Sequence, residues 1–82
     1  MVTATLTEEQ RLIADLNEFQ RNAKWFSENR RFLQEHLDQY VAVDHQQVVG
    51  VEFDPRVLNL RFEGRREVYI TWVGPPDLLW VL

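Results

Sequence analysis

The first 49 residues contain neither glycine nor proline, whereas all three glycines and all three prolines lie between residues 50 and 76. A segment without these two helix breakers can sustain a long helix. The apolar side chains in it follow steps of 4, 3, 4, 3, 7, 4 and 3 residues, and Arg30 fills the position that the longest step skips. This is the heptad pattern of an amphipathic helix. The stripe consists of Leu12, Leu16, Phe19, Ala23, Phe26, Leu33, Leu37 and Tyr40.

The start of this helix is marked by Thr7 and Gln10, which have the spacing of a capping box. Its course further on leaves two alternatives, because Ser27 is also a favourable N-cap for a second helix. Residues 8–24 carry a narrow apolar face, and residues 25–38 carry a wider one that can cover a core. The two segments are predicted to form either one rod or a hinged pair.

The second half of the chain has the pattern of strands. Residues 40–43 and 48–53 are two β-prone runs around a polar turn at residues 44–47, which predicts a hairpin. Gly50 inside the second run indicates a bulge or a close approach of another chain segment. A third strand is predicted at residues 68–73, where β-branched and aromatic residues fill every position.

The segment between the second and third strands allows two interpretations. As a helix, it has Asp54 at the N-cap, Pro55 in the first turn and Gly64 just past the end. As a strand, its apolar residues alternate with polar ones at Leu58, Leu60 and Phe62. The predicted fold class is α+β, with an N-terminal long helix or helix pair, a small mainly antiparallel sheet of three to four strands, and a possible short helix at residues 55–63.

The overall composition narrows the class of protein. A chain of 82 residues allows one small domain, or two at most. The net charge of −4, spread as −2 over residues 1–40 and −2 over residues 41–82, provides no basic patch for nucleic acid. No apolar run approaches the roughly 18 residues of a membrane span, and no signal peptide is visible. The absence of cysteine excludes disulfides and fits a cytoplasmic protein. Neither nucleic acid nor a membrane is an expected partner.

The chain offers few residues for catalysis. His36 falls in the predicted helix and His45 in the turn, and neither has the spacing of a metal site. Asp44, His45 and Asp54 are a possible polar cluster at one end of the sheet, although turn and capping roles account for both aspartates. The glycines form no phosphate-binding loop, and Ser27 is the only serine. The protein is therefore expected to be no enzyme and to hold no cofactor or metal ion.

Aromatic residues are numerous, with three Trp, two Tyr and five Phe in 82 residues. Small domains need bulky side chains inside, so the following are predicted to lie in the core: Trp25, Phe26, Phe32, Phe53 and Trp72. Phe19 and Trp80 fit a core and an interface equally well.

Three segments carry a pattern that can be compared with a known family. The helical part contains Trp25, Asn29 and Leu33, and the strands contain Gln39-Tyr40-Val41-Ala42-Val43, Val48-Val49-Gly50 and Val68-Tyr69-Ile70-Thr71-Trp72-Val73-Gly74-Pro75. Over residues 25–76 this pattern resembles a family of short prokaryotic domains of unknown function. The resemblance implies an α+β fold with a helix between the second and third strands, and it implies no activity. Some relatives are encoded beside retropepsin-like proteins, so it also implies such a protein as a partner.

Two segments are candidates for binding another protein. Residues 1–24 are interpreted as an amphipathic helical extension of a small α+β domain at residues 25–82, and the extension is predicted to bind a helix through Leu12, Leu16, Phe19 and Ala23. The apolar C-terminal segment is predicted to be covered by its own sheet or by a second molecule, with Leu79 and Trp80 as contacts.

These features favour a non-enzymatic protein–protein interaction module, either oligomeric or an obligate partner of a larger protein. The alternative is an antitoxin-like or regulatory protein that binds and inhibits one partner.

Overall fold

The computed structural model describes residues 7–75 and confirms the α+β fold class. Helix α1 (Glu8–Glu28) is followed by a short 3₁₀ helix, η1 (Arg30–His36). Strands β1 (Tyr40–Asp44) and β2 (Gln47–Glu52) form the hairpin, helix α2 (Pro55–Arg61) follows, and strand β3 (Tyr69–Trp72) closes the described part of the chain.

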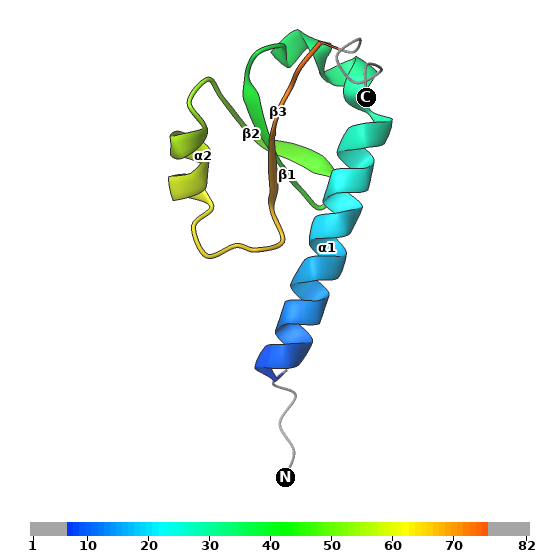
Figure 1. Ribbon diagram of the computed structural model, residues 1–82, viewed down its shortest axis with the longest axis vertical. Coiled ribbons are helices and arrows are strands. Elements are labelled where there is room, and N and C mark those ends of the chain that lie inside the picture. The colour runs from blue at the N-terminus through cyan, green and yellow to red at the C-terminus, as the bar shows by residue number, and fades with distance from the viewer. Residues whose placement is uncertain (1–6, 76–82) are drawn as a thin grey trace.

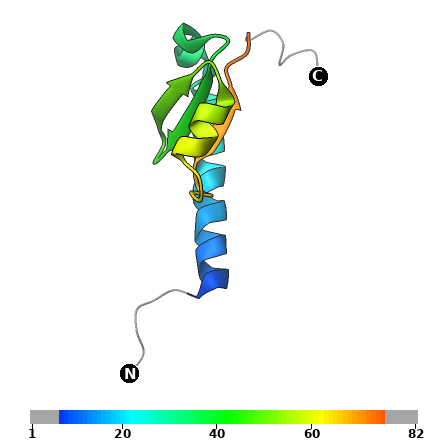
Figure 2. The ribbon, with the colours of Figure 1, turned by 90° about the vertical axis from the view of Figure 1, so that its left-hand side faces the viewer.

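The sheet has the order β2-β1-β3, and β1 is antiparallel to both neighbours. Helix α1 lies against one face of the sheet and α2 against the other, so the domain has three layers (Figures 1 and 2). Alternate residues of β1 serve the two faces. Val41 and Val43 pack with α1 and η1, whereas Ala42 packs with Leu58 of α2. The segment from β2 to β3 therefore crosses over the central strand through α2.

Helix α1 begins with the predicted capping box, in which the Gln10 N–H donates to Thr7 Oγ1 over 3.1 Å and the Thr7 N–H donates to Gln10 Oε1 over 3.0 Å. The helix runs through Ser27 without a break and ends at Glu28, with Asn29 as its C-cap. There the Asn29 side chain donates to the carbonyl of Trp25 over 2.8 Å. A polar side chain that bonds nearby backbone competes with helix continuation. The predicted long N-terminal helix is confirmed as α1, and the chain continues as the 3₁₀ helix η1 instead of a second α-helix that begins at Ser27.

The β1–β2 hairpin is confirmed, but its turn is shorter than the predicted residues 44–47. His45 and Gln46 have φ angles of 52° and 56°, and Asp44 already pairs with Gln47 in the ladder. Two consecutive left-handed residues are the signature of a type I′ turn, which matches the twist of a two-residue hairpin.

Gly50 has both properties that its position in a strand indicated. The pairing shifts from Ala42↔Gly50 to Val43↔Val48, which leaves Val49 as the extra residue of a bulge. A Cβ atom on Gly50 would lie 2.9 Å from Leu58 Cδ2. The missing side chain therefore lets α2 approach the sheet closely.

The helical interpretation of residues 55–63 is correct. Asp54 caps α2 by accepting a hydrogen bond from the Arg56 N–H over 2.9 Å, and Pro55 occupies the first turn. Gly64 follows in the left-handed conformation, with φ of 82°. Leu58 faces the sheet and is fully buried, whereas Leu60 is 73% exposed. By burying Leu58, the helix covers the second face of the sheet. An extra strand in this place would have extended the sheet and left that face uncovered.

Three of the five aromatic core predictions, those for Phe32, Phe53 and Trp72, are wrong. Phe26 is buried and Trp25 packs against the core, but Phe32 is 79% and Phe53 is 73% exposed. Phe32 precedes the buried Leu33 in a helix of three residues per turn, so the two side chains point in different directions. Phe53 lies beyond Glu52, where the strand pairing ends.

Trp72, the third of these, is exposed, with an exposed fraction of 40%. Its ring lies over the backbone of Gly74, where a Cβ atom would be 2.6 Å from the ring. Gly74 therefore provides the space that this side chain occupies.

The two leucines of α2 provide a matched test of this packing. Replacement of Leu58 by alanine is expected to lower the free energy of unfolding by about 2–5 kcal/mol, because it leaves a cavity between α2 and the sheet. Leu60→Ala in the same helix is expected to change it by less than about 0.5 kcal/mol. Urea denaturation of both variants measures the difference, and equal losses would contradict the orientation of α2.

Candidate functional site

The N-terminal half of α1 extends past the end of the sheet (Figure 1). On this half, Leu12, Ile13 and Leu16 are 46%, 55% and 54% exposed. At about 100° per residue they lie within roughly one third of the helix circumference. We call these three residues the open facet. Contiguous exposed apolar side chains of this kind are typical of interaction sites.

The four helix residues predicted to bind a partner divide into two groups. Leu12 and Leu16 belong to the open facet, whereas Phe19 and Ala23 are half-buried. The Phe19 ring packs edge-to-face on Tyr69 of β3, with ring centroids 5.3 Å apart and planes at 71°. The stripe thus begins beyond the sheet and passes onto it. Leu79 and Trp80, the other two predicted contacts, lie outside the described residues.

Helix α1 contacts the hairpin turn and the loop before β3 through a polar side chain, that of Asn22. Asn22 is fully buried. Its Nδ2 donates to the Glu67 carbonyl over 2.8 Å, and its Oδ1 accepts from the backbone N–H and the Nε2 of Gln46, both over 3.0 Å. One side chain therefore joins α1 to both connections of the sheet.

Glu18, one turn before Asn22, adds a second connection to the hairpin turn. Its Oε2 accepts from the His45 N–H over 3.1 Å and from Gln46 Nε2 over 3.3 Å, while Oε1 accepts from Arg21 over 2.8 Å. Partial burial raises the pKa of the Glu18 carboxyl, but the hydrogen bonds from Arg21 and His45 outweigh it. The pKa of Glu18 therefore lies below the ordinary value of 4.5.

Two arginines in the loop before β3 complete this contact. Arg66 pairs with Asp15 of α1 over 3.1 Å. Arg65 bridges Glu67, over 2.7 Å, and the buried Asp44 at the end of β1. The hydrogen bonds that Arg65 donates, first to Glu67 and then to Asp44, raise the pKa of Arg65 above its ordinary value. The loop is thus bound to the sheet by one arginine and to α1 by the next.

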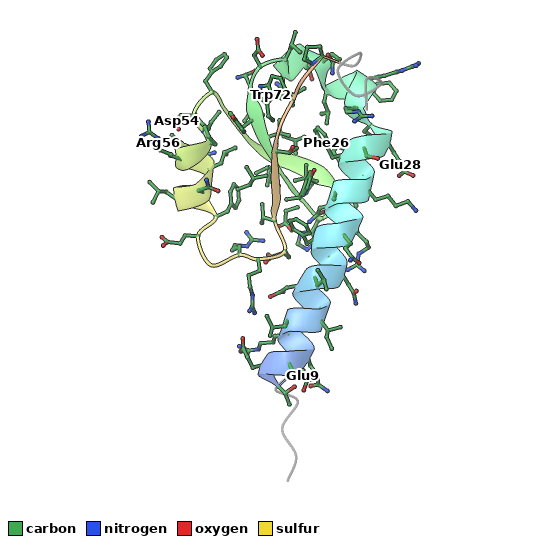
Figure 3. The ribbon with its side chains drawn as sticks, viewed as in Figure 1. Glu9, Phe26, Glu28, Asp54, Arg56 and Trp72 are labelled. Carbon is green, nitrogen blue, oxygen red and sulfur yellow. The ribbon has the colours of Figure 1, made fainter. Side chains whose placement is uncertain are left out.

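The predicted cluster of Asp44, His45 and Asp54 does not form. Asp44 lies at the closed end of the hairpin, opposite Gln47, whereas Asp54 follows the open end and pairs with Arg56 at the start of α2 (Figure 3). A hairpin places residues before its turn and residues after its second strand at opposite ends.

Glu18 takes the place of Asp54 beside Asp44 and His45. Ligand atoms of these three residues lie within 4.8 Å of one another, which is a spacing that a metal ion can bridge. Arg65 already pairs with Asp44, and Arg21 with Glu18. A guanidinium on each carboxylate neutralises the charge that would attract a cation. The cluster is therefore accounted for as part of the contact between α1 and the hairpin.

Comparison with known proteins finds no matching family model, no similar curated protein and no similar solved structure. Among residues 7–75, no helix combines the length and apolar character that crossing a bilayer requires.

Sequence reasoning missed Asn22 and Ile13. Ile13 lies outside the heptad steps of the stripe, although it neighbours Leu16, three residues further on, on the helix surface. Asn22 lies three residues after Phe19 and four before Phe26. An asparagine between two apolar residues of one helix face is the signal that could have identified a buried hydrogen-bonding position.

Asn22→Ala is expected to lower the free energy of unfolding by about 2–3 kcal/mol, because it leaves the half-buried Gln46 N–H and Glu67 carbonyl without their protein partner. Asn17→Ala, at an exposed position of the same helix, is expected to change it by less than about 0.5 kcal/mol. Urea denaturation measures both. A small effect at Asn22 would contradict its role as the connecting residue.

Glu18→Gln tests the charged part of this contact. Since the pKa of Glu18 is lowered in the folded state, its stabilisation is complete above the unfolded pKa and is lost as the pH falls through the folded value. The variant is therefore expected to be about 1 kcal/mol less stable than the wild type at pH 7, with a gap that closes as the pH falls below 4.5. Glu28→Gln, on the exposed side of α1, serves as control. A gap at Glu18 that is independent of pH would exclude a contribution of the charge.

Proposed function

We propose that the protein is a non-enzymatic interaction module that associates with a second copy of itself through the open facet of α1. The observation that carries the proposal is that different side chains of α1 contact the rest of the domain and solvent. Polar side chains, among them Glu18 and Asn22, bind it to the sheet's loops, whereas Leu12, Ile13 and Leu16 remain half-exposed. Covering the exposed leucine and isoleucine side chains of a protruding helix with a second apolar helix lowers the free energy, because it removes apolar surface from water.

Charge favours an antiparallel arrangement of the two copies. Glu9 and Lys24 are exposed, and they lie seven residues before and eight residues after Leu16. Two antiparallel α1 helices that cross near Leu16 bring Glu9 of each copy close to the partner's Lys24. A two-fold axis makes this contact twice, and complementary charges fix the register. Glu9 lies near the outer end of α1, away from the sheet (Figure 3).

The surface beside the facet can accept a side chain from the second helix. A hollow of about 300 Å³ is lined by Leu12, Leu16 and Phe19 on α1, together with Asp15 and Arg66. In paired helices, apolar side chains of one helix insert into such hollows on the other. The hollow and the facet therefore form one continuous surface for the same partner.

The oligomeric state of designed variants tests this function. The wild-type chain is expected to be a dimer by size-exclusion chromatography with light scattering. The double variant Leu12→Glu, Leu16→Glu is expected to be a monomer with an unchanged circular dichroism spectrum, because four like charges would meet at the pair. The control Arg11→Gln, Ala14→Glu changes the net charge by the same amount at exposed positions on the opposite side of α1 and is expected to remain a dimer.

Two results would contradict the proposal. The first is a wild-type chain that is monomeric at the highest soluble concentration. The second is a Leu12, Leu16 double variant that unfolds, because exposed residues on a protruding segment would then be core residues of the single chain.

A further inference from the structure

The hollow beside the open facet has the residue spacing of a helix-pairing site. Four of its lining residues are spaced i, i+3, i+4 and i+7 along α1, namely Leu12, Asp15, Leu16 and Phe19. Residues with this spacing are neighbours on a helix surface, and four neighbouring residues form the hole that receives one side chain of a facing helix. The fifth lining residue, Arg66, comes from the loop before β3. The hollow is therefore a helix-pairing hole with one additional wall.

Two acidic residues of α1 hold Arg66 in this position. Its Nη2 lies 3.1 Å from Asp15 Oδ2 and 3.5 Å from Glu8 Oε1, and its Nε donates to Asp15 Oδ2 over 3.2 Å. Glu8 and Asp15 are seven residues apart, so they lie on one side of the helix about two turns from each other. Leu12 lies between them on that side. The Arg66 side chain is thus fixed against the apolar residues of the hollow.

The neighbours of Arg66 fix the loop that carries it. Arg65 pairs with Glu67 and with the buried Asp44. The Glu67 carbonyl accepts the hydrogen bond from Asn22. The loop is therefore attached to the sheet on one side of Arg66 and to α1 on the other. A wall that is in place before association reduces the ordering cost of binding.

We infer that Arg66 is a specificity-determining residue of self-association, because it forms a wall of the hollow that receives Leu16 of the second copy. The inference rests on the proposed pairing of α1 helices. In two antiparallel helices that cross near Leu16, this side chain faces the residues around position 16 of the other helix, which form the middle of the hollow. The two-fold axis places Leu16 of each copy in the hollow of the other. The methylene groups of Arg66 then pack against the incoming leucine.

The guanidinium of Arg66 contributes by neutralising acidic side chains at this contact. Without it, Glu8 and Asp15 would leave two negative charges beside each hollow, and the two-fold axis would double that number. Like charges that meet at an interface oppose association. An unrelated apolar helix would fill one hollow, whereas a second copy also offers the matching hollow for Leu16. The loop before β3 therefore favours a second copy of the domain as the partner.

The dissociation constant of the dimer, measured by sedimentation equilibrium on full-length variants, tests the inference. Arg66→Glu places three carboxylates beside each hollow and is expected to raise the dissociation constant by about tenfold or more. Arg61→Glu is the matched control, because Arg61 pairs with Glu52 over 2.9 Å on α2 and its side chain is 45% exposed, against 47% for Arg66. This control is expected to change the constant by less than about twofold.

Two further variants separate the ion pair from a loss of folding, which circular dichroism monitors. The double variant Asp15→Arg, Arg66→Glu restores an ion pair in the opposite orientation, and it is expected to return the dissociation constant to within about threefold of the wild-type value. Arg66→Gln removes the charge without adding another. It is expected to raise the dissociation constant by about threefold or more, and it provides the comparison with Arg61→Gln if Arg66→Glu does not fold.

The outcomes distinguish this inference from the proposed function. A wild-type dimer that responds equally to the Arg66 and Arg61 variants would overturn the inference and leave the pairing of α1 helices intact. A charge-swapped double variant that stays as weak as Arg66→Glu would exclude the ion pair with Asp15 as the cause, and would also overturn it. A monomeric wild-type chain would contradict the proposed function itself, and the inference with it.

Discussion

The buried amide of Asn22 is the constraint on which the arrangement of this domain depends. A fully buried amide must satisfy both of its ends, and Asn22 does so with Gln46 in the hairpin turn and Glu67 in the loop before β3. These partners come from two different connections of the sheet. They therefore fix the rotation of α1 about its axis as well as its position. This rotation buries Phe26 and turns Leu12, Ile13 and Leu16 away from the sheet.

Charged residues around Asn22 extend this contact along the helix. Asp15 binds Arg66, Glu18 binds the hairpin turn, and Arg65 neutralises the buried Asp44. Isolated surface ion pairs contribute little to stability, but a network that shares a buried asparagine and backbone groups is more rigid than its separate pairs. The outer half of α1 is thus held at a defined angle by polar contacts. Leu12, Ile13 and Leu16 stay about half-exposed beside these contacts.

Local sequence signals predicted the elements of the fold well. The capping box at Thr7, the bulge at Gly50 and the capped helix after Asp54 each depend on neighbouring residues, and each is present in the structure. The alternation of Leu58, Leu60 and Phe62 predicted a strand and was the weaker signal. Capping residues favour a helix here, and a helix also covers the second face of the sheet. The end of α1 at Asn29 was missed, since Ser27 offered a more familiar cap.

The candidate site was predictable only in part, because it depends on contacts between distant segments. The heptad stripe identified Leu12 and Leu16, but periodicity cannot tell which part of a stripe the domain itself covers. The covered part is set by the hydrogen bonds of Asn22 to Gln46 and to Glu67. These bonds join residues that are 24 and 45 positions apart in the sequence. For the same reason, composition placed Phe32 and Phe53 in the core. The short turn of η1 exposes Phe32, and Phe53 is exposed because the pairing of β2 ends one residue earlier.

Disulfide trapping of the proposed α1 pair tests the central claim most directly, because the chain contains no cysteine of its own. If two α1 helices cross near Leu16, a cysteine at that position meets its own copy within the roughly 4–7 Å that a disulfide requires between Cα atoms. The account predicts that Leu16→Cys forms a linked dimer under mild oxidation of the folded protein, and that Ala14→Cys, on the far side of the helix, does not. Equal linking at the two positions, or none at Leu16, would contradict it.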